Sequence, residues 1–119
     1  MTTILLVEDD EMNKDMLSRR LMKKGYDVIF AVNGQEAIDM AKSEAPDVIL
    51  MDMGLPIKSG LEATKEIKEN ADTVNIPIIA LTANAMAEHR KEALDGGFDE
   101  FETKPVRLPS LLEKINKYT

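Results

Sequence analysis

The chain contains no cysteine, which excludes disulfide bonds, thiolate metal sites and cysteine nucleophiles. It has no apolar stretch long enough to span a membrane, and its N-terminus lacks the pattern of a secretory signal peptide. No run of lysine and arginine stands out, and the net charge is -7 at pH 7. We therefore expect a cytoplasmic protein that binds neither nucleic acid nor a membrane surface directly.

The composition is that of an ordinary globular protein, with 44% hydrophobic and 31% charged residues. The length of 119 residues is close to the commonest domain size, and no linker, repeat or low-complexity stretch divides the chain. We therefore predict one domain over residues 1–119.

Five short aliphatic runs alternate with segments of helical spacing. The runs are Ile4–Val7, Val28–Val32, Val48–Met51, Ile76–Leu81 and the weaker Phe98–Phe101. The first four are almost continuously apolar, which predicts strands buried on both faces. The alternation predicts an α/β fold, a doubly wound (βα)₅ domain whose parallel sheet carries helices on both faces.

The helical segments carry apolar residues at a spacing that brings them to one side of a helix. These stripes comprise Met12, Met16, Leu17 and Leu21; Ala37, Ile38, Ala41 and Ala45; Leu61, Thr64 and Ile67; and Leu108, Leu111, Leu112 and Ile115. The segment Met86–Asp95 has a much thinner stripe, so we expect a helix there that is held to the sheet more loosely.

Four acidic residues follow the first run in the stretch ILLVEDDE. Asp10 and Glu11 are explained by the start of a helix, because Asp10 can cap it and an acid in the first turn gains about 0.3–1 kcal/mol from the helix dipole. Glu8 and Asp9 stand at the carboxyl end of the run, as Asp52 does after the third run. If these strands are neighbours, the three carboxylates share one crevice beyond the sheet.

Carboxylates about 4–5 Å apart repel by roughly 3–4 kcal/mol per pair at an effective dielectric of 20, which exceeds the helix-dipole energy. Such a cluster needs a cation or a shared proton. Mg²⁺ suits two or three carboxylates with open positions, because it keeps several waters and favours phosphate oxygens. Spacing alone leaves both a metal site and a set of helix caps and turns open.

Two further strand ends place a polar group at the same edge. Thr82 follows the fourth run in IIALTANA, and Lys104 follows the fifth in FETKP. Taken singly, Thr82 would be a strand-end cap and Lys104 a surface charge. Beside the acids, a hydroxyl and an ammonium group form a cradle suited to a phosphoryl group, whose oxygens need neutralisation.

The chain resembles the CheY-like receiver domain of two-component response regulators over essentially its whole length. The matching stretches are LLVEDD, VILMDMGLPIKSG, IIALTANA and FETKP, in the same order and at the same strand ends. The resemblance implies a flavodoxin-like three-layer sandwich with strand order 2-1-3-4-5. It also implies a bacterial signalling switch that promotes its own phosphorylation and slow autodephosphorylation, and not a turnover enzyme.

The resemblance also implies a role for each polar strand end. Asp52 would be the phosphoacceptor, which takes a phosphoryl group from a partner phosphohistidine, and Lys104 would pair with a phosphoryl oxygen. Asp9 would bind Mg²⁺ directly, with Mn²⁺ as a substitute, and Glu8 would act mainly through a metal-bound water. Asp52 and the backbone carbonyl of Gly54 would complete the protein ligands.

Thr82 would be the switch hydroxyl and Phe101 the aromatic switch residue. A phenylalanine lacks the hydroxyl group of the tyrosine often found there, so no output contact through a phenol is expected. The Lys104–Pro105 bond would be cis. The implied output face is the fourth helix, fifth strand and fifth helix. The implied partners are a histidine kinase or histidine phosphotransfer protein and a downstream protein target. Little chain follows Lys117, which favours a stand-alone receiver over one cut from a larger protein such as a hybrid kinase. We also expect a monomer.

Three alternatives share parts of this pattern. A phosphatase of the haloacid-dehalogenase type needs a second Asp two residues after the first, where this chain has Gly54. A flavin carrier on the same fold needs a Ser/Thr- and Gly-rich phosphate loop after the first strand, and EDDEMN is its electrostatic opposite. Nothing supports a receiver that no longer takes phosphate, since all five key positions are filled.

Overall fold

A computed structural model of the chain describes residues 2–53, 55, 58–82, 95–104 and 106–119. Its strands are β1 (Thr3–Val7), β2 (Asp27–Ala31), β3 (Val48–Asp52), β4 (Ile78–Thr82) and β5 (Glu100–Thr103). Its helices are α1 (Glu11–Lys23), α2 (Gly34–Glu44), α3 (Gly60–Glu69) and α5 (Leu108–Tyr118). The strands form one parallel sheet with the order β2-β1-β3-β4-β5, which confirms the predicted flavodoxin-like fold.

Some predictions fall outside the described residues. They concern the backbone carbonyl of Gly54, the Lys104–Pro105 bond and, except for Asp95, the helix over Met86–Asp95. They stay predictions.

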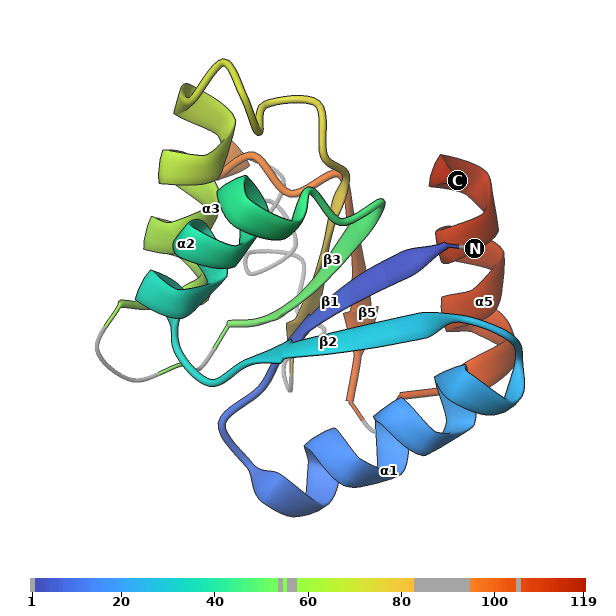
Figure 1. Ribbon diagram of the computed structural model, residues 1–119. Coiled ribbons are helices and arrows are strands. Elements are labelled where there is room, and N and C mark those ends of the chain that lie inside the picture. Colours follow the sequence, from blue (N-terminus) through green and yellow to red (C-terminus); the bar gives the residue numbers. More distant parts are fainter. Residues whose placement is uncertain (1, 54, 56–57, 83–94, 105) are drawn as a thin grey trace.

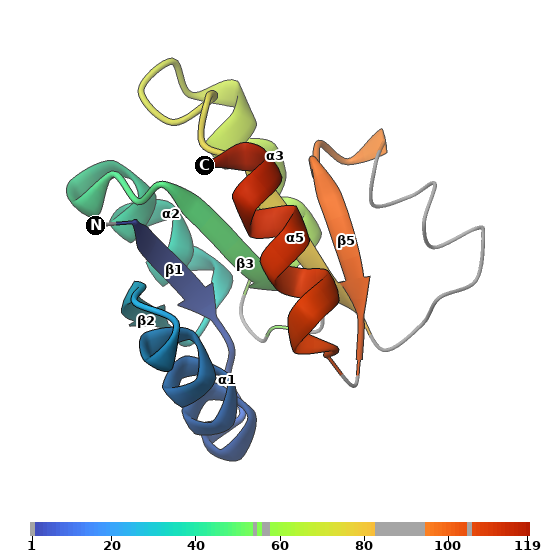
Figure 2. The same cartoon turned by 90° about the vertical axis from the view of Figure 1, so that its right-hand side faces the viewer.

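The helices cover both faces of the sheet (Figure 1). Helices α2 and α3 lie on one face, and α1 and α5 lie on the other (Figure 2). Because successive strand side chains point to opposite faces, β1 sends Leu5 and Val7 into the core under α2 and α3, and Ile4 and Leu6 into the core under α1 and α5. Nearly every residue of β1, β3 and β4 is buried in this way, as the continuous apolar runs predict.

The prediction of a strand buried on both faces is wrong for β2. Asp27 and Phe30 are exposed, and Val28 and Ile29 are only half-buried. The reason is that β2 is an edge strand, paired with β1 alone, so the core covers it incompletely. At the other edge, β5 begins two residues after the start of the predicted run, and Phe98 packs into the core ahead of the strand.

The predicted core stripe of α1 is also wrong in its first half. Met12 is 76% exposed and Met16 is 52% exposed, whereas Leu21 is fully buried. The start of α1 lies beyond the carboxyl end of β1, where the sheet offers little surface to pack against (Figure 1). By contrast, α5 buries Leu111 and Ile115 as its spacing predicts.

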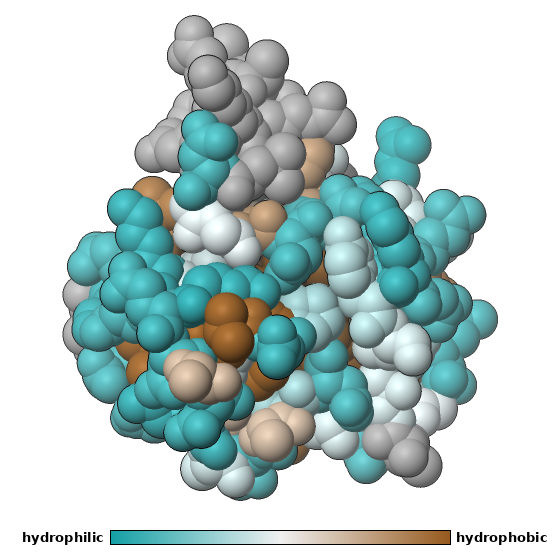
Figure 3. Space-filling view, turned by 90° about the horizontal axis from the view of Figure 1, so that it is seen from above, coloured by the Kyte–Doolittle hydropathy of each residue, from teal (hydrophilic) through white to brown (hydrophobic). Residues whose placement is uncertain are grey.

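No helix in the described ranges is long and apolar enough to cross a membrane. The face drawn in Figure 3 is mostly hydrophilic, with hydrophobic residues confined to small areas between hydrophilic ones. This surface agrees with the high charged fraction of the sequence.

Among the described residues, one buried side-chain oxygen has no hydrogen-bond partner. Thr64 of α3 is fully buried, and its hydroxyl makes no hydrogen bond within the described part of the chain. Since an unpaired buried hydroxyl costs about 1–3 kcal/mol, we expect Thr64→Val to raise the free energy of unfolding by about 1 kcal/mol in urea titrations.

Thr73→Val is the matched control for this substitution. Thr73 is equally buried, but its hydroxyl donates to the carbonyl oxygen of Ile67 at 2.7 Å. Because Thr73→Val loses this hydrogen bond, its free energy of unfolding should fall by about 1 kcal/mol. A Thr64→Val variant that is less stable than wild type would contradict the assignment.

Candidate functional site

The strand order places the ends of β1 and β3 side by side. Val7 pairs with Met51, so Glu8 and Asp9 leave β1 next to Asp52 at the end of β3. Carboxylate oxygens of these three residues lie within 4.8 Å of one another. The carboxylate cluster predicted from the strand ends is therefore present.

The three acids differ in exposure. Glu8 is 3% exposed and Asp52 is 8% exposed, whereas Asp9 faces solvent. The backbone N–H of Glu8 still donates to the carbonyl of Ala31 at 3.0 Å, which extends the pairing between β1 and β2 and fixes Glu8 at the sheet edge. Glu8 and Asp52 are thus held in place by burial, and Asp9 is open to solvent. An ion bound by the three would keep coordination positions on the solvent side for water or a ligand.

Asp10 is separate from this cluster, as expected. Its side chain accepts hydrogen bonds from the backbone N–H groups of Met12 and Asn13, at 2.9 and 3.1 Å, and so caps α1. Glu11 lies in the first turn of the helix. Both acids therefore have the helix-start role that the sequence predicts.

Lys104 joins the buried acids from the end of β5. Its ammonium group donates to Asp52 Oδ2 at 3.0 Å and to Glu8 Oε2 at 3.3 Å. Burial alone would lower the pKa of Lys104, but the hydrogen bonds and charges of Asp52 and Glu8 together raise it above 10.5. The ammonium therefore stays charged and offsets part of the acidic charge at this edge.

Glu8 has an unusual protonation equilibrium. Its pKa is raised from 4.5 to about 7: burial is the largest cause, the hydrogen bond and charge of Asp52 add to it, and Lys104 acts in the opposite direction. A metal ion bound by these carboxylates would have to displace that proton near neutral pH.

The two predicted switch residues lie near the same edge. Thr82 ends β4, is 9% exposed, and accepts a hydrogen bond at its carbonyl from the backbone N–H of Lys104 at 2.7 Å. Phe101 is half-buried on β5 and packs against the core under α2 and α3. Of the predicted site residues, only Gly54 lies outside the described residues.

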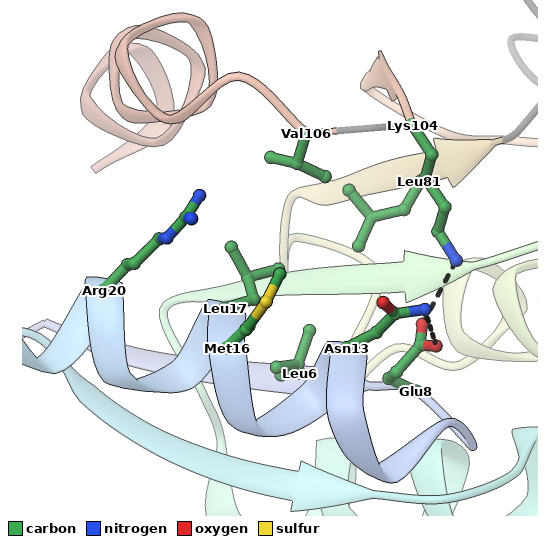
Figure 4. Close-up of a pocket in the computed structure, with 9 residues that line it drawn as sticks. All are labelled: Leu6, Glu8, Asn13, Met16, Leu17, Arg20, Leu81, Lys104 and Val106. Atoms are coloured by element: carbon green, nitrogen blue, oxygen red, sulfur yellow. Dashed lines mark hydrogen bonds and ion pairs between the residues drawn. The ribbon is translucent and has the colours of Figure 1, made fainter.

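The structure adds a residue that sequence reasoning missed. Asn13, in the first turn of α1, directs its amide nitrogen at Glu8 Oε1 from 3.5 Å (Figure 4). Asn13, Glu8 and Lys104 line one end of a pocket of about 540 Å³, and Arg20 lies toward its other end (Figure 4). The sequence signal was the place of Asn13 one turn after Asp9, on the helix that starts at the acidic strand end.

A model of the response regulator receiver domain matches residues 4–116. The chain belongs to this family. It is 39% identical over 116 residues to the polar-differentiation response regulator DivK of Brucella anthropi, covering 98% of this chain and 94% of that protein. Like other receivers it is therefore part of a two-component or phosphorelay signalling system and acts as a switch.

Two solved receiver structures bear on the site. The receiver domain of sensor histidine kinase PA1611 from Pseudomonas aeruginosa has a TM-score of 0.91 at 35% identity, covers 98% of this chain and 96% of its own, and holds a magnesium ion in its active-site cleft. The receiver of Saccharomyces cerevisiae Ssk1, crystallised with the histidine phosphotransfer protein Ypd1, has a TM-score of 0.90 at 33% identity, with 98% and 88% covered.

The carboxylates of this chain fit the same kind of ion. Glu8, Asp9 and Asp52 offer only oxygen donors, which Mg²⁺ prefers, and they can approach a common point. Among the described residues, Lys104 brings one ammonium group to these three carboxylates, so a divalent cation would offset the remaining negative charge.

Proposed function

We propose that this receiver accepts a phosphoryl group on Asp52 from a phosphohistidine of a histidine kinase or histidine phosphotransfer protein. The observation that carries the proposal is the ion pair of Asp52 with Lys104 beside two further carboxylates at one strand edge. The complex of the Ssk1 receiver with Ypd1 supports a phosphotransfer protein as one class of partner.

In the transfer step, a carboxylate oxygen of Asp52 forms a bond to phosphorus while the bond from phosphorus to the histidine nitrogen breaks. Lys104, already 3.0 Å from Asp52, neutralises charge on the transferred oxygens. Glu8, Asp9, Asp52 and, by resemblance, the carbonyl of Gly54 would hold Mg²⁺ or Mn²⁺. When bound, this ion supplies charge neutralisation and alignment of the reacting oxygens.

The product then acts as a switch. An aspartyl phosphate adds about 1.5–2 negative charges at one point, which favours a new arrangement of the hydroxyl of Thr82 and the ring of Phe101. The output face would comprise the helix predicted over Met86–Asp95 together with β5 and α5. We infer a monomer in the cytoplasm that controls a downstream protein target and slowly loses its phosphate by autodephosphorylation.

Intact-mass measurement with acetyl phosphate and Mg²⁺ tests the phosphoacceptor directly. We expect wild type to gain one phosphoryl group, and Asp52→Asn to gain none because an amide cannot form the acyl phosphate. Asp39→Asn, which changes an exposed acid of α2, is the matched control and should label like wild type. A label that persists in Asp52→Asn, or that forms equally after chelation of Mg²⁺, would contradict the proposal.

A further inference from the structure

A lysine of α5 makes three contacts at the middle of β5. The ammonium group of Lys114 donates to the carbonyl oxygen of Phe101 at 2.7 Å and to the carboxylate of Glu102, and it lies over the Phe101 ring, 5.5 Å from the ring centroid. These contacts involve two consecutive strand residues whose side chains point to opposite faces of the sheet.

The carboxylate of Glu102 fixes this ammonium group in place. Glu102 is 4% exposed, and besides Lys114 it accepts a hydrogen bond from the hydroxyl of Ser110 at 3.1 Å. Both donors come from α5. A buried carboxylate with two donors from one helix gives the lysine a defined position, unlike an exposed ion pair, in which long side chains move freely.

The position of the ammonium matters because of the ring beneath it. A cation over an aromatic face is attracted by the ring quadrupole. The contact therefore stabilises the orientation of the Phe101 ring seen in the structure relative to other orientations of this side chain. Phe101 is only half-buried, and it lies on β5, an edge strand of the sheet. The side chain of Lys114 thus links the orientation of the Phe101 ring to α5.

We propose that Lys114 is a positioning residue for Phe101 and sets the balance between the ring position in the structure and its alternatives. The part of this inference that concerns signalling rests on the proposed function, in which Phe101 changes place on phosphorylation. If phosphorylation of Asp52 changes the orientation of the Phe101 ring, the two equilibria are coupled, and the coupling is reciprocal. A contact of Lys114 that favours one ring orientation must then alter the response to phosphorylation.

Fluorine NMR of protein made with fluorophenylalanine tests the positioning. The chain has three phenylalanines, so the spectrum is simple, and Phe101→Leu identifies the resonance of Phe101. We expect Lys114→Met to shift this resonance, with about a fivefold change in the ratio of ring positions from loss of the cation contact. Lys114→Arg keeps a cation and the carboxylate pair, and should restore the wild-type signal.

Lys117→Met is the matched control. Lys117 lies one turn further along α5 and pairs with Glu100 of β5 at 3.7 Å, and its ring contact is with Tyr118. Its replacement removes the same charge and a pair to the same strand, and should leave the Phe101 resonance in place. Should Lys114→Met unfold the protein, the cause is that the buried carboxylate of Glu102 has lost its cation. In that case the same NMR comparison is made with the double variant Lys114→Met/Glu102→Gln, in which position 102 has no charge.

The second measurement is the titration of Mg²⁺-loaded protein with beryllofluoride, followed at the Phe101 resonance. We expect the apparent affinity to change about fivefold in Lys114→Met and to be unchanged in Lys117→Met. Equal spectra for wild type and Lys114→Met, or equal effects of the two substitutions, would overturn the inference. If the Phe101 resonance of wild type does not respond to beryllofluoride, the proposed function is overturned instead. The spectra of the variants without beryllofluoride still decide the role of Lys114.

Discussion

At pH 8 without Mg²⁺, Glu8→Gln will be more stable than the wild-type chain by about 2–3 kcal/mol in urea titrations. Glu8 is almost fully buried, and burial together with Asp52 raises its pKa from 4.5 to about 7. Between these two values the folded chain keeps a proton that the unfolded chain releases. Wild-type stability therefore falls as the pH rises through this window, whereas a glutamine cannot ionise.

The advantage of Glu8→Gln should disappear below about pH 4.5, because Glu8 is then protonated in both the folded and the unfolded chain. Glu11→Gln, which changes an exposed acid of the same stretch, should have little effect at either pH. Wild-type stability that is flat from pH 5 to pH 8 without metal would contradict the assigned cause.

Mg²⁺ should reduce the difference in stability between Glu8→Gln and wild type at pH 8. An ion that binds only the folded chain adds stability that grows with the ratio of its concentration to its dissociation constant. Because the ion needs ionised carboxylates, this gain should increase with pH in wild type and be smaller in Glu8→Gln. An equal gain in both proteins would exclude a role of Glu8 in holding the ion.

The sequence predicts the members of the site better than their energetics. The carboxyl ends of parallel strands share an edge, so Glu8, Asp52 and Lys104 are brought together by topology alone, although 52 residues separate Asp52 from Lys104. The burial of Glu8, which raises its pKa, depends on how the neighbouring elements close over the strand end. No local pattern in the sequence reports that.

The predictions that were wrong concern exposure at the borders of the fold. An apolar run looks the same at a central and an edge position, so the half-exposed β2 could not be distinguished from β1. The exposed Met12 and Met16 fit a helical stripe, but α1 begins beyond the sheet that would cover them. The contact of Lys114 with Phe101 depends on side-chain positions that spacing does not define.

Gly60→Ala will destabilise the chain by about 2–3 kcal/mol and slow the labelling of Asp52 by about 100-fold. Gly60 is the first residue of α3, and a Cβ atom there would lie 2.4 Å from the carbonyl oxygen of Asp52 and 3.0 Å from Cα of Met53. Since both neighbours are backbone, α3 and the end of β3 must separate. The displaced carbonyl belongs to the phosphoacceptor itself, so its carboxylate moves relative to Lys104.

Gly34→Ala separates this displacement from a general loss of stability. A Cβ atom at position 34 would lie 2.1 Å from the carbonyl oxygen of Lys58, to which the N–H of Gly34 donates at 3.1 Å. The clash is again with backbone, and a similar loss of stability is expected, but the displaced carbonyl lies six residues from Asp52. At a temperature where both variants are folded, Gly34→Ala should accept phosphate at nearly the wild-type rate and Gly60→Ala should not. Equal labelling of the two variants would mean that close packing of α3 stabilises the fold without orienting Asp52.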